Sequence, residues 1–148
     1  MLKYSAVAAV ALLLPLGVTA RQMPGRHPGY VHALQDLRYA RALLERGDRG
    51  WGPVAADQQR ATAEIDRAIE ELRRAAMDDG RNPNEGRRPD MRWEPRDRLR
   101  RASEALRGAR ESISREEDNR GAREWRDRAF HHIEEAQRAL HHAMDRWR

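Results

Sequence analysis

The most constraining feature of the sequence is a repeat of large and small apolar residues. A Leu or Ile is followed by Ala three residues later and by Leu seven residues later. The pattern occurs four times, at Leu37-Ala40-Leu44, Ile65-Ala68-Leu72, Leu99-Ala102-Leu106 and Ile133-Ala136-Leu140. Successive units are 28, 34 and 34 residues apart. Spacings of three and four residues are those of a heptad seam, so each unit predicts one amphipathic helix.

Four such helices predict an all-α fold, an antiparallel up-down-up-down four-helix bundle. Large and small residues alternate along each seam, so the helix backbones can approach closely at the alanines. The connection between the last two helices is short, which makes them antiparallel neighbours. Proline, glycine and capping residues between the units predict helices at about 28-46, 57-78, 95-117 and 120-147.

The tryptophans fall near the predicted helix ends. In an up-down-up-down order, Trp51 and Trp125 share one end of the bundle, and Trp93 and Trp147 share the other. Large amphipathic rings bury well at a boundary with water, so we expect them to close the bundle ends. An aromatic ligand cleft at one end is the alternative.

Residues 1–20 have the pattern of a secretory signal peptide. Lys3 precedes an apolar run over residues 6–16, and small residues surround a cleavage site after Ala20. Residues 21–148 are then the mature four-helix domain, which we expect to be periplasmic or secreted. The apolar run is short for a spanning helix, which needs about 20 residues. We therefore expect no stable membrane span after cleavage, with an uncleaved anchor as the alternative.

The charges of the chain are balanced and dispersed. There are 29 basic and 24 acidic residues, and Lys3 is the only lysine, so residues 21–148 keep 28 arginines. Interspersed signs are typical of solvated helix faces. The stretch 81–101 is rich in arginine and contains Trp93, but acidic residues interrupt it, and we predict no nucleic-acid partner. The longest break between helices, residues 78–94, is predicted to be a solvated loop, with a binding role as the alternative.

No catalytic motif is present in the sequence. The chain has no cysteine, which also excludes a disulfide framework. The hydroxyl nucleophiles of the mature domain are Thr62, Ser103, Ser112 and Ser114, and none adjoins a histidine or lies in a glycine-flanked turn. No glycine-rich phosphate loop follows a strand. We therefore predict that the protein is not an enzyme.

Histidine pairs on the last predicted helix are the candidate metal ligands. With Ile133 at heptad position a, His132 falls on the flank of the seam and the other three histidines face outward. Residues four apart share a helix face, so one histidine of each pair lies beside a carboxylate. The candidate residues are His131, Glu135, His141, Asp145, His132 and His142. The two groups lie roughly 15 Å apart along the helix, too far to share an ion. Two ligands make a weak site for Cu, Zn or Ni, and a solvated helix face is the alternative.

The repeated units resemble those of small exported bacterial four-helix proteins. EIDRAIEELRRAA and HHIEEAQRALHHA are similar to the helical units of the periplasmic small metal-binding proteins, which repeat His-x-x-Glu-Ala-type motifs. IDRAIEELRRAAMDDGRN and SREEDNRGAREWRDRAFHHIEEA resemble an uncharacterised family of bacterial exported proteins. The resemblance covers most of residues 27–144. It implies a four-helix fold and an exported location, and the first group adds metal binding through histidine.

Two functions are compatible with these observations. The first is an exported, non-enzymatic binding or scaffold module that contacts an unknown envelope protein through its charged faces and needs no cofactor. The alternative is weak periplasmic binding of a divalent transition metal, Cu, Zn or Ni, through surface histidines and carboxylates. A monomer is the default expectation for either function.

Overall fold

The protein is all-helical in the part of the chain that the computed structural model describes, residues 28–45, 51–78, 93–116 and 120–147. The four helices are close to those predicted, and a short 3₁₀ turn, η1, leads into the second. Their bounds are α1 Pro28–Glu45, η1 Gly52–Val54, α2 Ala55–Asp78, α3 Pro95–Ser114 and α4 Arg120–Arg146. Residues 1–20, the predicted signal peptide, lie outside the described residues, as do residues 79–92 of the predicted loop. None of the described helices is long and apolar enough to cross a membrane.

Two helix ends differ from the prediction for local reasons. The chain enters α2 through η1, so α2 starts two residues before Asp57, which lies in its first turn rather than at its cap. Helix α3 ends at Ser114, three residues early. Just beyond that end, the carboxylate of Glu116 accepts a hydrogen bond from the backbone N–H of Gly29 in the first turn of α1. An anion there is favourable because the first N–H groups of a helix have no partner within it.

The core is the predicted seam. Every Leu, Ile and Ala of the four repeat units has no exposed surface, and the alanines that extend the pattern are equally buried. Those extending residues are Ala33, Ala61, Ala129, Ala75, Ala109 and Ala143. Burial of the same repeat positions on all four helices confirms a single helical bundle with an interior of alternating large and small residues.

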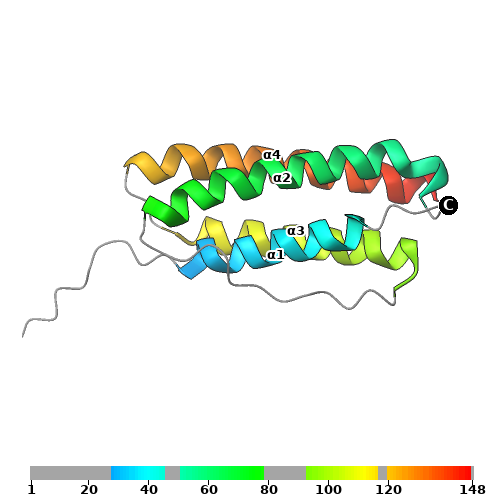
Figure 1. The fold of residues 1–148 in the computed structure, drawn as a ribbon, viewed down its shortest axis with the longest axis horizontal. Coiled ribbons are helices and arrows are strands. Elements are labelled where there is room, and N and C mark those ends of the chain that lie inside the picture. The colour runs from blue at the N-terminus through cyan, green and yellow to red at the C-terminus, as the bar shows by residue number, and fades with distance from the viewer. Residues whose placement is uncertain (1–27, 46–50, 79–92, 117–119, 148) are drawn as a thin grey trace, which may run out of the picture.

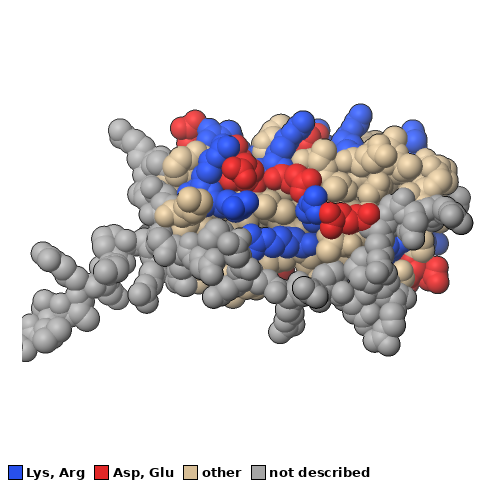
Figure 2. Space-filling model, in the orientation of Figure 1, with Lys and Arg blue, Asp and Glu red and all other residues tan. Residues whose placement is uncertain are grey.

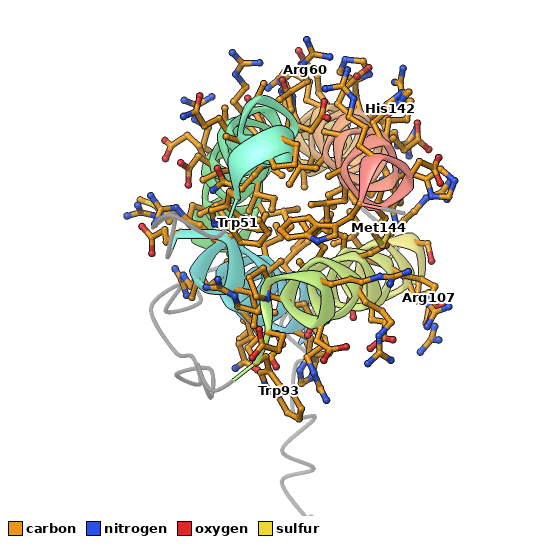
Figure 3. All side chains as sticks on the ribbon, turned by 90° about the vertical axis from the view of Figure 1, so that its right-hand side faces the viewer. Trp51, Arg60, Trp93, Arg107, His142 and Met144 are labelled. Atoms are coloured by element: carbon orange, nitrogen blue, oxygen red, sulfur yellow. The ribbon has the colours of Figure 1, made fainter. Side chains whose placement is uncertain are left out.

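The helices occupy the corners of a square, and each contacts two neighbours (Figures 1 and 3). Helix α1 lies beside α2 and α3, and α4 lies beside the same two helices, whereas α1 and α4 face each other across the diagonal. Each neighbouring pair is antiparallel, because its contacts join the start of one helix to the end of the other. Contacts that fix these directions are Gln58 with Leu44, Gly29 with Glu116, and Glu71 with Arg128, and for α3 and α4 the cavity that Arg96 and Asp145 line together.

The predicted up-down-up-down order is wrong. Helices α2 and α3 run in the same direction, so the order is up-down-down-up, with α1 and α4 parallel across the other diagonal (Figure 1). The end of α2 and the start of α3 therefore lie at opposite ends of the bundle. A connection as long as residues 79–94 allows this arrangement, because an extended chain of that length reaches about 50 Å and a 20-residue helix is only about 30 Å long. Only a short loop forces two successive helices to be antiparallel, and the connection between α2 and α3 is not short.

The direction of α3 also changes which tryptophans share an end of the bundle. The rings of Trp51 and Trp147 meet edge to face, with their centroids 5.9 Å apart. Trp93, just before α3, belongs to the same end of the bundle (Figure 3). Trp125 lies in the first turns of α4, at the opposite end. The expectation that Trp51 and Trp125 share an end was therefore wrong, because it assumed that α3 and α4 run the other way, whereas Trp93 and Trp147 do lie at the same end.

Helices α1 and α3 approach each other closely at two glycines. A Cβ atom at Gly29 would overlap the backbone oxygen of Ser112 and the carboxylate of Glu116. A Cβ atom at Gly108 would come within 2.9 Å of the Oδ2 atom of Asp36. That closeness buries Asp36, and burial raises the pKa of its carboxyl group, although nearby His32 opposes the shift. The two glycines thus set the distance between α1 and α3.

We predict that Gly29→Ala lowers the free energy of unfolding by about 1–3 kcal/mol, because the added methyl group forces the ends of α1 and α3 apart. Chemical denaturation followed by circular dichroism measures this change. Gly52→Ala is the matched control, since a Cβ atom at Gly52 would meet nothing within 4 Å. Equal stability of the two variants would show that α1 and α3 are not in close contact at Gly29.

Candidate functional site

An acidic row on α2 holds that helix against α4. Asp57, Glu64 and Glu71 recur at seven-residue intervals, each just before a seam position, and their side chains are 15%, 13% and 13% exposed. Each carboxylate faces a basic side chain of α4. The pairs are Asp57 with Arg146 at 3.6 Å, Glu64 with His132 at 2.7 Å, and Glu71 with Arg128 at 3.0 Å. Arg146 and Arg128 are 63% and 39% exposed, whereas both members of the Glu64–His132 pair are mostly covered, so that pair is the one least screened by solvent.

His132 is therefore a structural contact between helices. Its Nδ1 atom lies 2.7 Å from Glu64, and its side chain is 20% exposed. Glu64 also accepts a hydrogen bond of 2.6 Å from Arg67 on its own helix. The ring of His131 lies 5.5 Å from that of His132 but is exposed. The predicted flank position of His132 and the outward positions of His131, His141 and His142 agree with their burial.

The six predicted metal-site residues are not gathered into one site. Glu135 forms an ion pair with Arg138, and His132 is engaged with Glu64. His141 and Asp145 line one cavity together, and Asp97 of α3 lines it from the other side. Across the described ranges, no three histidine, aspartate or glutamate side chains are close enough together to hold a metal ion. Metal binding by these residues stays a prediction.

The bundle end that contains Trp51 is closed. Trp51 is 3% exposed, and the guanidinium of Arg98, itself only 6% exposed, lies over its ring at 4.9 Å. The amide of Gln58, at a seam position of α2, donates a hydrogen bond of 2.6 Å to the carbonyl of Leu44. It thereby satisfies one of the last carbonyls of α1. Trp51 closes this end of the bundle (Figure 3), and an aromatic cleft is not formed around it.

Trp93 differs from Trp51 in being partly open to solvent. It is 37% exposed, and Arg101 stacks on its ring at 3.5 Å. A planar guanidinium on an indole face is a favourable cation–π contact. Trp93 lies outside the core, beside the first turn of α3 (Figure 3). The expectation that all tryptophans close the bundle ends therefore holds for Trp51 and not for Trp93.

A surface depression lies between α3 and α4, which are the least closely packed of the neighbouring helices in the described part of the protein. Two cavities follow one another there, with volumes of about 290 and 430 Å³, and His141 lines both. We call this feature the α3–α4 groove. Its lining residues are Arg96, Asp97, Arg100, His141, Met144 and Asp145 in the first cavity, and Ser103, Glu134, Gln137, Arg138 and His141 in the second.

The groove exists because the residues that flank the two seams are long or polar. On α3 the flanking positions hold Arg96, Ser103 and Arg110, and on α4 they hold Gln137 and Met144. None of these side chains is fully buried, so water reaches the space between the helices. The α2–α4 contact differs, because the flank of α4 there includes buried Ala139. Figure 3 shows Met144 at the boundary between α4 and α3, whereas His142 lies on the side of α4 away from α3.

The face formed by α1 and α2 is rich in charged side chains of both signs in the part of the chain that the structure describes. Basic and acidic side chains alternate across it without forming a patch of one sign (Figure 2). Arg41 illustrates the pattern, because it forms ion pairs with both Asp66 on α2 and Glu45 on its own helix. These hydrogen bonds raise the pKa of Arg41 above its usual range. Such a face is the solvated surface that the interspersed charges predicted.

Comparison with known proteins identifies no relative. No protein-family model, curated protein or solved structure matches the chain. The candidate site is therefore defined by the geometry of the α3–α4 groove.

Sequence reasoning missed the groove and the acidic row for different reasons. The row could have been found, since Asp57, Glu64 and Glu71 precede seam positions at regular heptad spacing. The groove could not, because a single seam does not reveal which flank of α3 faces which neighbour. His141 and Asp145 were identified as a pair, but their position at the groove depends on how α3 packs.

Proposed function

We propose that the protein is an exported, non-enzymatic binding module of the bacterial envelope, and that its binding surface is the α3–α4 groove. The observation that carries this proposal is the groove itself. Two adjoining surface cavities share His141, and their lining follows α4 from Glu134 to Asp145, about three helical turns. Concave surfaces of this size are where proteins most often bind ligands or partner segments.

Export and the absence of catalysis belong to the same proposal. Export is supported by the signal-peptide pattern of residues 1–20. A non-enzymatic role is supported by the hydroxyl groups, because Thr62 and Ser114 donate hydrogen bonds to carbonyls of their own helices. Such bonds are ordinary back-bonding within a helix and do not activate a nucleophile.

We predict that a photoreactive amino acid placed at Ser103, in the groove, forms a covalent adduct with one partner protein in living bacteria that express the full chain. The same group placed at Ala63 is the control, because Ala63 is exposed on the outer face of α2. Adducts are detected by gel mobility and identified by mass spectrometry. The proposal fails if Ser103 gives no adduct, or only the adducts that Ala63 gives.

The alternative proposal is weak binding of Cu, Zn or Ni. It is supported by His141 and Asp145, which line one cavity that Asp97 also lines. It is opposed by Arg96 and Arg100 in the same cavity, because two guanidinium groups repel a bare cation. Two or three mixed ligands on flexible side chains give at best a weak site.

Calorimetric titration of the mature chain with each of the three ions separates the two functions. The binding-module proposal predicts no metal affinity tighter than about high micromolar, as expected for two ligands on an exposed helix face. A tighter site that His141→Ala abolishes and His142→Ala leaves intact would favour the metal function, because only His141 lines the cavity.

A further inference from the structure

The first cavity of the α3–α4 groove has more positive than negative charge available to a ligand. Neither of its two acidic residues is without a partner. Asp97 pairs with Arg100 at 3.1 Å, and Asp145 has an interaction of its own within the protein. Arg96 and His141, in contrast, have neither ion pair nor hydrogen bond with any described residue, and both line this cavity. The groups left to a ligand are therefore a guanidinium and an imidazole.

The second cavity has a different character. Glu134 pairs with Arg110 at 2.9 Å, and Arg138 pairs with Glu135, so its charges are matched. Between these pairs lie Ser103 and Gln137, whose neutral groups can donate and accept hydrogen bonds. Neutral polar groups of this kind suit the N–H and C=O groups of an extended polypeptide better than they suit a compact ion.

The two cavities together form one trench with a cationic end. They share His141, and the α3 residues that border them extend from Arg96 to Ser103. On α4 the lining residues extend from Glu134 to Asp145. At 1.5 Å per residue, that distance along the helix is about 16 Å. An extended chain of about five residues covers that length.

We propose that the occupant of the α3–α4 groove is an extended acidic segment of a partner protein. A carboxylate of the segment sits between Arg96 and His141, and its backbone runs over Ser103 and Gln137. Charge complementarity favours the acidic segment, because the guanidinium of Arg96 lines the cavity without an ion pair to any described residue, while Asp97 is paired with Arg100. The imidazole of His141 adds a hydrogen-bonding group beside it. Met144, which borders the first cavity and packs against the core, supplies an adaptable apolar wall. This inference rests on the proposed function, since it names the partner chemistry for the same surface.

The test uses blocked octapeptides and the mature chain labelled with ¹⁵N, at low ionic strength. The acidic peptide contains serine, glycine and three aspartates, and its matched peptide has asparagine at those three positions. We expect the acidic peptide to shift the amide signals of Ser103, Gln137 and His141, and to bind at least about threefold more tightly than the asparagine peptide. That ratio is the contribution of one exposed ion pair.

Two double variants with the same change in charge provide the decisive comparison. Arg96→Gln with His141→Gln should weaken binding of the acidic peptide about tenfold, which corresponds to the loss of one exposed ion pair and one hydrogen bond. Arg107→Gln with His142→Gln should change it less than about twofold. Arg107 and His142 are exposed on the same two helices but do not line either cavity (Figure 3). Equal losses in the two variants would indicate general electrostatic attraction and would overturn the inference.

A citrate titration separates an acidic segment from a small anion. Citrate carries three carboxylates but no backbone, so we expect it to leave the signals of Ser103 and Gln137 unshifted. Citrate that binds as tightly as the acidic peptide would overturn the inference in favour of a small anion.

If Ser103 yields an adduct in cells but the acidic peptide shows no preference, this inference fails and the proposed function stands. The absence of a cellular adduct would contradict the proposed function itself.

Discussion

Packing of alanine against leucine and isoleucine along four seams is the constraint on which the rest of this structure depends. The small residues let the helix backbones approach, and the large residues fill the adjacent layers. All repeat positions are completely buried, so the interior leaves no space for polar chemistry apart from Gln58, which caps α1, and Arg98, which covers Trp51.

Ligand contacts must therefore be made by residues that flank the seams, and the flanks differ between helix pairs. Where the flank is an acidic row against basic residues, as between α2 and α4, the surface is closed. Where it is arginine, serine, glutamine and methionine, as between α3 and α4, a groove opens.

The direction of α3 determines which features come together. Because α3 runs parallel to α2, its first turn lies beside the last turns of α4 and at the same end of the bundle as the start of α2. That places Trp51, Trp147 and Trp93 at one end of the bundle and aligns the cationic end of the groove with them. At the opposite end, the carboxylate of Glu116 accepts a hydrogen bond from a backbone N–H in the first turn of α1. The two ends are therefore chemically distinct although the four seams are nearly equivalent, and a partner that binds in the groove has a defined orientation.

The sequence predicted the helices and their buried faces accurately, because heptad spacing reports directly on which side of a helix avoids water. Leu37, Ile65, Leu99 and Ile133 are all at the core, as expected. It also placed His132 on the flank and the other α4 histidines outside.

The sequence did not predict the direction of α3, because a connection as long as residues 79–94 permits either direction and no local signal distinguishes them. The groove was missed for the same reason, since Arg96 and His141 become neighbours only once α3 and α4 are placed side by side. The role of His132 was missed because its partner, Glu64, lies 68 residues away in the sequence.

The helix order can be tested by measuring one distance between spin labels, and the absence of cysteine makes labelling simple. Met77→Cys and Glu94→Cys place labels at exposed positions near the end of α2 and just before α3. Pulsed electron–electron resonance should give a separation of about 30 Å or more, the length of a 20-residue helix. The pair Glu45→Cys and Ala56→Cys, across the connection between α1 and α2, should give a much shorter distance in either order. A separation of about 20 Å or less for the first pair would mean that α3 runs antiparallel to α2, and would contradict the up-down-down-up bundle.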